Sequence, residues 1–170
     1  MHPQEHRLHA RLPVAVHIFL LRDHHVLLLR RANTGYEDGN YSVVAGHLDG
    51  GESVAQAAIR EAYEEVGIAL RPTDLTVVGV MHRVSQEERI DFFLVATTWG
   101  GTLTNQEPDK CSELRWCALD ALPVNTIPYV RAALENFSRG VWFAEFGCLR
   151  PVPNQESPIM ASHPGLAEPV

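Results

Sequence analysis

Residues 46–68 read GHLDGGESVAQAAIREAYEEVGI, a glycine-rich segment that runs into a strongly acidic one. Ser53 is a residue type that caps the start of a helix, and Gly67 is a type that ends one. Between them, apolar residues recur at every fourth position, at Val54, Ala58, Ala62 and Val66. The segment therefore predicts a loop followed by an amphipathic helix over residues 53–66.

Three glutamates gather on one side of this predicted helix. Glu61, Glu64 and Glu65 stand at positions i, i+3 and i+4, so their carboxylates lie within one narrow arc. Like charges at these spacings weaken a helix by roughly 0.2–0.5 kcal/mol per pair, and a bound divalent cation would remove that repulsion. Carboxylate oxygens suit hard cations, so the cluster predicts a site for Mg²⁺ or Mn²⁺. The alternative is a solvated helix face, which is what most charged helical stretches are.

The loop and the helix also supply groups that can support this cluster. Residues 46–51 contain three glycines, which let the backbone approach a metal or a phosphate closely. The carbonyl group of Gly46 is a candidate metal ligand. Glu52 and Arg60 are eight positions apart, and we expect them to pair and to hold the acidic residues in register.

The spacing of this segment is that of a known family. Every fixed letter of the Nudix box, G-x5-E-x7-R-E-U-x-E-E-x-G-U with U a bulky aliphatic residue, is matched, by Gly46, Glu52, Arg60, Glu61, Glu64, Glu65 and Gly67. Ala62 departs from the first U position, but it is not an expected ligand. Seven such matches have chance odds on the order of one in 10⁸ per window, which argues against the solvated helix face. The chain resembles the Nudix hydrolases.

The resemblance implies a fold, a site and a reaction. The fold is the Nudix α/β/α sandwich, an α/β fold with a mixed sheet between helices, over about residues 13–140. The three glutamates would bind the metal, with one of them or a downstream acid as the base, while Arg60 and Glu52 orient the cluster. The reaction would be attack of water on a phosphorus atom of a nucleoside diphosphate linked to another group.

Regular structure is expected on both sides of the acidic helix. Strands are predicted at residues 14–21, 26–29, 41–44, 75–82, 90–98 and 114–117. Residues 30–40 carry turn residues and predict a loop over the site. A second helix is predicted at about residues 127–137, on the other side of the sheet. We divide the chain into a polar arm (1–12), the hydrolase domain (13–149) and a flexible, proline-rich tail (150–170).

The composition limits the class of protein. A chain of 170 residues with 45% hydrophobic residues is long enough for one domain with a real core. A net charge of −7 argues against a protein that binds nucleic acid through a broad basic surface. The three cysteines suggest neither a disulfide framework nor a zinc ribbon. Without a signal peptide core or a membrane-spanning run, we expect a cytoplasmic protein without membrane contact. Homodimers are common among Nudix enzymes, which leaves a homodimer open.

Several other residues are candidates for binding the substrate. Arg30 and Arg31 could meet its phosphates or form a solvated strand end, and His47 could bind a phosphate or the base or simply face water. Tyr41 could stack on a base, although aromatic residues in strands more often fill the core. The same two interpretations apply to His82, Phe92 and Phe93, and Glu107, Asp109 and Glu113 are candidates for an additional metal ligand or base.

Three functions compete for this chain. Residues 107–111, EPDKC, and Trp116 resemble a stretch of Nudix enzymes that act on nucleoside triphosphates, including MutT-like enzymes. This favours hydrolysis of a nucleoside triphosphate to a monophosphate and pyrophosphate. The alternative within the same fold is hydrolysis of ADP-ribose, dinucleoside polyphosphates or nucleotide sugars. A nucleotide sensor without turnover is the alternative from another class, and the intact glutamate cluster argues against it.

Overall fold

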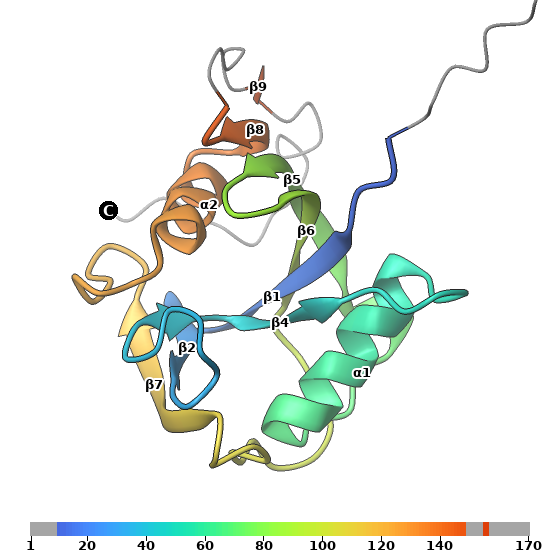
Figure 1. The fold of residues 1–170 in the computed structure, drawn as a ribbon. Helices are drawn as coiled ribbons and strands as arrows, with labels where there is room; N and C mark the ends of the chain where they lie inside the picture. Colours follow the sequence, from blue (N-terminus) through green and yellow to red (C-terminus); the bar gives the residue numbers. More distant parts are fainter. Residues whose placement is uncertain (1–9, 149–154, 157–170) are drawn as a thin grey trace, which may run out of the picture.

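A mixed β-sheet lies between two helices in the computed structural model, which describes residues 10–148 and 155–156 (Figure 1). The helices are α1 (Val54–Val66) and α2 (Pro128–Ser138), and a short 3₁₀ helix, η1, covers Pro72–Asp74. The strands are β1 (Val14–Arg22), β2 (His25–Arg31), β3 (Tyr41–Ser42), β4 (Val44–His47), β5 (Thr76–Val84), β6 (Glu88–Ala96), β7 (Cys111–Ala118), β8 (Val141–Phe146) and β9 (Gln155–Glu156). The expected α/β/α sandwich is confirmed.

Strand β1 organises the sheet. The strand order is β3-β2-β1-β6-β5-β8-β9, with β4 also paired to β1 and β7 to β2. The β1–β6 and β5–β8 pairs are parallel, and the other pairs are antiparallel. One edge of β1 pairs with β6, whereas the other edge pairs first with β4, over residues 15–18, and then with β2, at residues 21–22. Strands β4 and β2 therefore leave β1 at different points, and both contribute to the pocket described below.

Each helix buries its apolar stripe against one face of the sheet (Figure 1). Because successive strand residues point to opposite faces, β1 feeds both cores: Ile18 packs on the α1 side and Phe19 on the α2 side. The α1 residues of the first core are Ala57, Ala58, Ala62 and Val66, and the α2 residues of the second are Tyr129, Val130, Ala133, Leu134 and Phe137. The second helix thus packs on the predicted side.

Helix α1 begins and ends at the predicted residues. Ser53 accepts a hydrogen bond from the backbone N–H of Gln56, whose side chain accepts one from the backbone N–H of Ser53, which forms a capping box. Gly67 ends the helix in the left-handed conformation, with φ of 70°. Within the described part of the chain, neither helix is long and apolar enough to span a membrane.

The structure corrects several of the predicted elements. The strand predicted at residues 41–44 is two strands, β3 and β4, and β4 includes Gly46 and His47 of the predicted loop because both pair with β1. Arg30 and Arg31 belong to β2 rather than to the following loop, because they pair with β3 and β7. Strand β7 begins at Cys111, three residues before its predicted start. No strand is predicted where β8 lies, although its sequence VWFAEF is a β-rich run directly after Gly140. Strand β9 lies within the expected tail, and the rest of that tail and most of the N-terminal arm fall outside the described residues.

Candidate active site

The three glutamates of α1 line a pocket with a volume of about 570 Å³. Strands β1, β2, β4 and β5 supply its other walls, together with the β5–β6 turn and the segment before β7. A pocket of this size suits a nucleotide-sized ligand. The predicted acidic cluster thus lies at a cavity and not on a convex helix face.

Gly46 lies against the carboxylate of Glu61. A β-carbon added at Gly46 would collide with both carboxylate oxygens of Glu61, so only glycine leaves room for this carboxylate. The end of strand β4 and helix α1 therefore meet at this point. The backbone of Gly46 is one of the groups that line the pocket.

Burial destabilises the charged form of two of the three carboxyl groups, those of Glu61 and Glu65. Burial, together with the charge of Glu61, raises the pKa of Glu65 to about 8, although Glu65 accepts a hydrogen bond of 3.2 Å from the backbone N–H of Ala45. Burial also raises the pKa of Glu61, against the opposing effect of its hydrogen bond from Arg60. Two crowded carboxyl groups of raised pKa form a site in which a cation would be stabilising.

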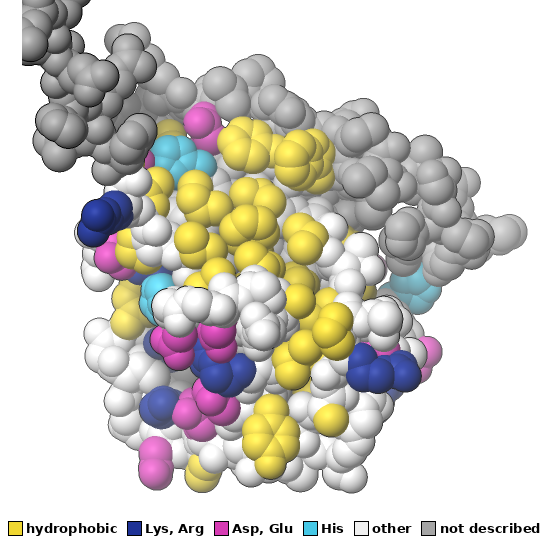
Figure 2. Space-filling model, turned by 90° about the vertical axis from the view of Figure 1, so that its right-hand side faces the viewer, with side chains coloured by type: hydrophobic (Ala, Val, Ile, Leu, Met, Phe, Trp, Pro, Cys, Tyr) yellow, Lys and Arg dark blue, Asp and Glu magenta, His cyan; other side chains and the backbone are white. Residues whose placement is uncertain are grey.

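Arg60 connects the loop to the acidic cluster. Its guanidinium group donates two hydrogen bonds to Glu52, of 2.7 and 2.9 Å, and this contact lowers the pKa of Glu52 to about 2. It also donates to Glu61 at 2.7 Å, to Glu64 at 3.3 Å and to the backbone carbonyl of His47 at 3.0 Å. Acidic and basic side chains accordingly gather on the face of the molecule that carries α1 (Figure 2). The structure brings Glu52 and Arg60 together as their spacing suggested.

A buried polar cluster that spans four elements adjoins the pocket, and three of its members, His17, Arg83 and Tyr129, line the pocket. His17 of β1, Asp91 of β6 and Arg83 of β5 are each at most 3% exposed. Arg83 donates to Asp91 at 2.5 and 3.4 Å, and its guanidinium carbon lies 3.9 Å from the ring centroid of Tyr129 on α2. Burial would raise the pKa of Asp91, but its contacts with His17 and Arg83 outweigh this effect and lower it. The cluster holds a charged pair in the interior.

His17 is the member of this cluster that lacks a partner. Its Nε2 faces a carboxylate oxygen of Asp91 at 3.4 Å without hydrogen-bond geometry, and its Nδ1 has no hydrogen-bond partner among the described residues. The ring stacks on Phe93, with centroids 4.9 Å apart, and burial lowers its pKa. A buried, neutral imidazole with unsatisfied nitrogens lines the pocket.

Basic side chains stand on the remaining walls. Arg89 contacts Nε2 of His47 at 2.8 Å, and its own Nε is buried without a partner in the described part of the structure. Arg31 is held by the backbone carbonyl of Tyr36 at 2.8 Å, and Lys110 pairs with Glu107 at 2.7 Å. The pocket therefore combines the α1 carboxylates with cations on its other walls, where Lys110 pairs with Glu107 and Arg89 with Glu87.

The structure separates the substrate-binding candidates into two groups. Arg31, His47 and Glu107 line the pocket, whereas Arg30 and Tyr41 do not. Arg30 donates to the backbone carbonyl of Gly39 at 3.2 Å. The position of Tyr41 in β3 turns its side chain away from the pocket and into the α2-side core. There its hydroxyl group donates a hydrogen bond of 2.6 Å to Glu113.

The other candidates lie elsewhere. Phe92 and Phe93 pack in the cores on the α1 side and the α2 side, as strand alternation requires, and His82 pairs with Glu88 outside the pocket. Asp109 and Glu113 do not line the pocket either.

Sequence reasoning missed much of the pocket lining, including five basic or aromatic residues, and some of these carried a signal. His17, Arg83 and Asp91 interrupt strands that are otherwise largely apolar, and a polar residue in a buried strand usually has a specific partner. Which residues pair could not be read from the chain, because they come from three strands. The five basic or aromatic residues are His17, Tyr36, Arg83, Arg89 and Tyr129.

Comparison with known proteins agrees with this geometry. The model of the NUDIX domain matches residues 11–139. The chain belongs to the Nudix family. It is 33% identical over 113 residues to the NAD-capped RNA hydrolase NudC of Pseudomonas aeruginosa, covering 66% of this chain but only 38% of that protein. It is 28% identical over 123 residues to the ADP-ribose pyrophosphatase of Methanocaldococcus jannaschii, covering 71% and 70% of the two chains.

A solved Nudix structure has the same fold. The crystal structure of a MutT NUDIX hydrolase from Burkholderia pseudomallei superposes with a TM-score of 0.68 at 31% identity. The match covers 74% of this chain and 98% of the other.

Proposed function

We propose that this Nudix chain hydrolyses a nucleoside triphosphate to a monophosphate and pyrophosphate. The observation that carries the proposal is the pocket itself, in which the Arg60-held glutamates of α1 face the cations of the other walls. The resemblance of residues 107–111 to enzymes acting on triphosphates supports this substrate. Glu107, Lys110 and Cys111 of that stretch line the pocket.

The residues present fit a divalent cation. Glu61 and Glu65 are crowded and have raised pKa values, and Gly46 leaves the space that the Glu61 carboxylate occupies. We propose that Glu61, Glu64 and Glu65, with the carbonyl of Gly46, hold Mg²⁺ or Mn²⁺. When bound, the cation neutralises phosphate charge and lowers the pKa of water. Arg60, restrained by Glu52, keeps the carboxylates in place.

The remaining groups would bind the substrate and move the proton. Arg31, Arg89 and Lys110 neutralise the phosphates, and His47 lies beside Arg89. Water attacks one phosphorus, the bond from that phosphorus to the leaving phosphate oxygen breaks, and the proton of the water passes to a carboxylate. That base is one of the three glutamates or Glu107, the downstream acid that lines the pocket. The Nδ1 atom of His17, which has no partner among the described residues, would bind a polar group of the substrate.

A second substrate class is favoured by the relatives. The names of the two relatives concern NAD-capped RNA and ADP-ribose, in both of which a pyrophosphate joins adenosine to a second ribose. The same carboxylates would cut that linkage. Cytoplasmic location, a small-molecule substrate and a homodimer stay predictions.

The test is turnover with Mg²⁺ across nucleoside triphosphates, oxidised triphosphates, ADP-ribose and dinucleoside polyphosphates, with the products separated. Glu64→Gln is expected to lower kcat by about 10²- to 10⁴-fold. Glu135→Gln removes an exposed carboxylate of α2, on the other side of the sheet, and is expected to retain activity. His17→Phe is expected to raise KM roughly three- to tenfold, the effect of one lost hydrogen bond.

The outcomes separate the proposals. Monophosphate and pyrophosphate from triphosphates, lost in Glu64→Gln, support the first proposal. Turnover of ADP-ribose alone would replace it with the second. Nucleotide binding without turnover of any substrate would contradict both and indicate a sensor.

A further inference from the structure

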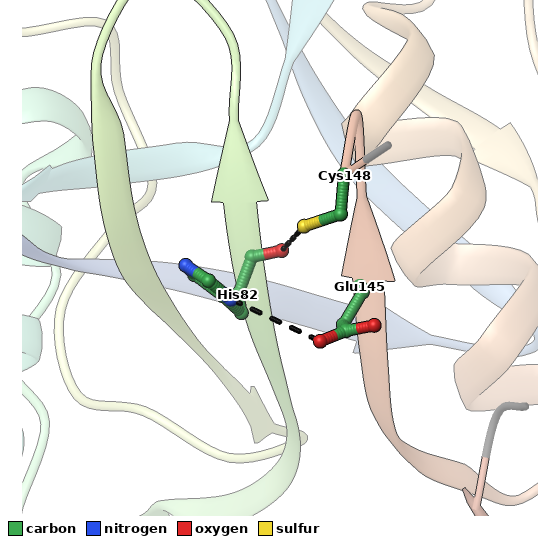
Figure 3. Close-up of side chains that lie close together, drawn as sticks. All are labelled: His82, Glu145 and Cys148. Carbon is green, nitrogen blue, oxygen red and sulfur yellow. Dashed lines mark hydrogen bonds and ion pairs between the residues drawn. The ribbon is translucent and has the colours of Figure 1, made fainter. Parts of the chain in front are cut away.

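A second group of metal-ligand side chains lies outside the pocket, on strands β5 and β8. His82, Glu145 and Cys148 each place one ligand atom within 4.8 Å of the others (Figure 3). The Nδ1 atom of His82 lies 4.0 Å from Oε1 of Glu145. None of the three lines the pocket that holds the glutamates of α1.

The backbone brings these side chains together. In the parallel β5–β8 pair, His82 and Glu145 are direct partners. Gly147 follows β8 with φ of 76°, and a β-carbon at that position would collide with the backbone carbonyl of Val84. This glycine turn carries Cys148 back to β5, where its Sγ lies 4.0 Å from the carbonyl oxygen of His82 (Figure 3). The cluster therefore rests on sheet pairing and on a turn that requires glycine.

The imidazole of His82 is oriented from its other side. Its Nε2 lies 2.8 Å from a carboxylate oxygen of Glu88, on the adjacent strand β6. A histidine that binds a metal almost always donates its second ring N–H to a carboxylate, a carbonyl or water. The contact with Glu88 holds Nε2 as the donor and leaves Nδ1, the nitrogen that faces Glu145, as a ligand.

The charges around Cys148 favour a cation. The carboxylates of Glu88 and Glu145 lie 2.8 and 4.0 Å from the two ring nitrogens of His82, the residue whose carbonyl oxygen Cys148 contacts. The same negative charges would attract a cation bound between these side chains. The site combines a thiol, an imidazole and a carboxylate, a softer set than the all-oxygen cluster of α1.

We propose that His82 Nδ1, Glu145 and Cys148 bind Zn²⁺, with Glu88 orienting His82 and water completing the coordination. Three protein ligands of these types with one open position are a common zinc arrangement. Tetrahedral bonds of about 2.0–2.3 Å place ligand atoms about 3.3–3.6 Å apart, so side-chain movements of about 1 Å close the site. The thiol proton passes to solvent on binding. The ion would join β5 to the end of β8 and is independent of the catalytic cation.

Cobalt tests this site, because a cobalt–thiolate bond has its own charge-transfer absorption. The full-length chain is stripped of metal, kept reduced and supplied with excess Mg²⁺ to occupy the α1 carboxylates, and is then titrated with Co²⁺ and, separately, Zn²⁺. We expect the thiolate band to saturate at one Co²⁺ per chain, and Zn²⁺ to displace it and to raise the melting temperature. Cys148→Ser is expected to abolish the band, and Glu88→Gln to weaken Zn²⁺ binding about 10- to 100-fold.

A matched variant controls for charge. Glu87→Gln removes an exposed carboxylate from the same β5–β6 hairpin but not from the cluster, and Zn²⁺ affinity is expected to stay unchanged. Melting curves without metal check that each variant is folded, and His82→Asn provides a second ligand variant. A missing thiolate band at one equivalent of Co²⁺, or a band that survives in both Cys148→Ser and His82→Asn, would overturn the proposal.

Discussion

At the scale of single residues, the contact between Gly46 and Glu61 is the most sensitive point of the proposed site. A methyl group at residue 46 would occupy the position of the Glu61 carboxylate. We therefore expect Gly46→Ala to displace this carboxylate and to lower kcat/KM about 100-fold, the usual effect of a 1 Å displacement in an active site. Steady-state kinetics measure the loss.

Gly50→Ala is the control for this prediction. Gly50 lies in the loop that follows β4; a β-carbon at residue 50 meets nothing within 4 Å, and the backbone there does not require glycine. We expect wild-type kinetics from this variant. Equal losses in both variants would show that the loop, and not the Glu61 contact, is responsible.

Glu65 makes the stability of the metal-free protein depend on pH. The folded state keeps Glu65 protonated up to about pH 8, whereas the unfolded chain releases that proton near 4.5. The folded state binds more protons in this window, so the free energy of unfolding falls as pH rises, by at most about 1.4 kcal/mol per pH unit. His17, with a pKa below 6.5, adds little above pH 6.5. Urea unfolding in chelator is expected to show lower stability at pH 8 than at pH 6.5.

Two variants identify the group responsible for this slope. Glu65→Gln is expected to flatten the profile between pH 6.5 and 8, and the exposed Glu135→Gln is expected to keep it. Saturating Mg²⁺ is expected to raise the free energy of unfolding more at pH 8 than at pH 6.5, because at pH 8 less of the Glu65 population has to lose a proton before the metal binds. A wild-type profile that is flat or rises with pH would contradict the assignment.

At the scale of elements, the last turn of α1 carries Glu64 and Glu65, and Gly67 ends it. A side chain at residue 67 would have to adopt φ of 70° and would meet the Gln106 side chain at 2.7 Å. We expect Gly67→Ala to lower the free energy of unfolding by about 1–2 kcal/mol. Denaturant unfolding measures this change.

Gly100→Ala is the matched glycine-to-alanine control for Gly67→Ala. A β-carbon at residue 100 makes ordinary contacts of 3.7 Å with Ala69, so a change within about 1 kcal/mol is expected. If both variants lost the same stability, the left-handed conformation of Gly67 would not be the cause.

At the scale of the whole molecule, the buried pair of Arg83 and Asp91 connects the sheet to α2 through Tyr129. Arg83→Met leaves a buried carboxylate without its cation, and we expect a loss of about 3–5 kcal/mol in the free energy of unfolding. The double variant Arg83→Met, Asp91→Leu removes both charges and is expected to be more stable than Arg83→Met alone. Unfolding curves of Arg83→Met, Asp91→Leu and the double variant form a double-mutant cycle. If the loss in the double variant equalled the sum of the two single losses, the two side chains would not be coupled.

Much of the proposed metal site could be predicted from residues 46–68 alone. A helix is a local structure. Its apolar period, its cap at Ser53 and its end at Gly67 each depend only on residues within about one helical turn. The arc of three glutamates and the pairing of Glu52 with Arg60 follow from the same short stretch of chain. The domain boundaries and the tail stay predictions, since most of the terminal residues lie outside the described part.

Tertiary structure alone decided how the pocket is completed. His17, Arg83 and Asp91 are brought together by the pairing of β1 with β6 and of β6 with β5, and strand pairing depends on contacts between residues far apart in the chain. For the same reason Tyr41 turned into the core while Tyr129 reached the pocket, and Cys148 came to lie beside His82. Local spacing determined which carboxylates stand together, and long-range packing determined what faces them.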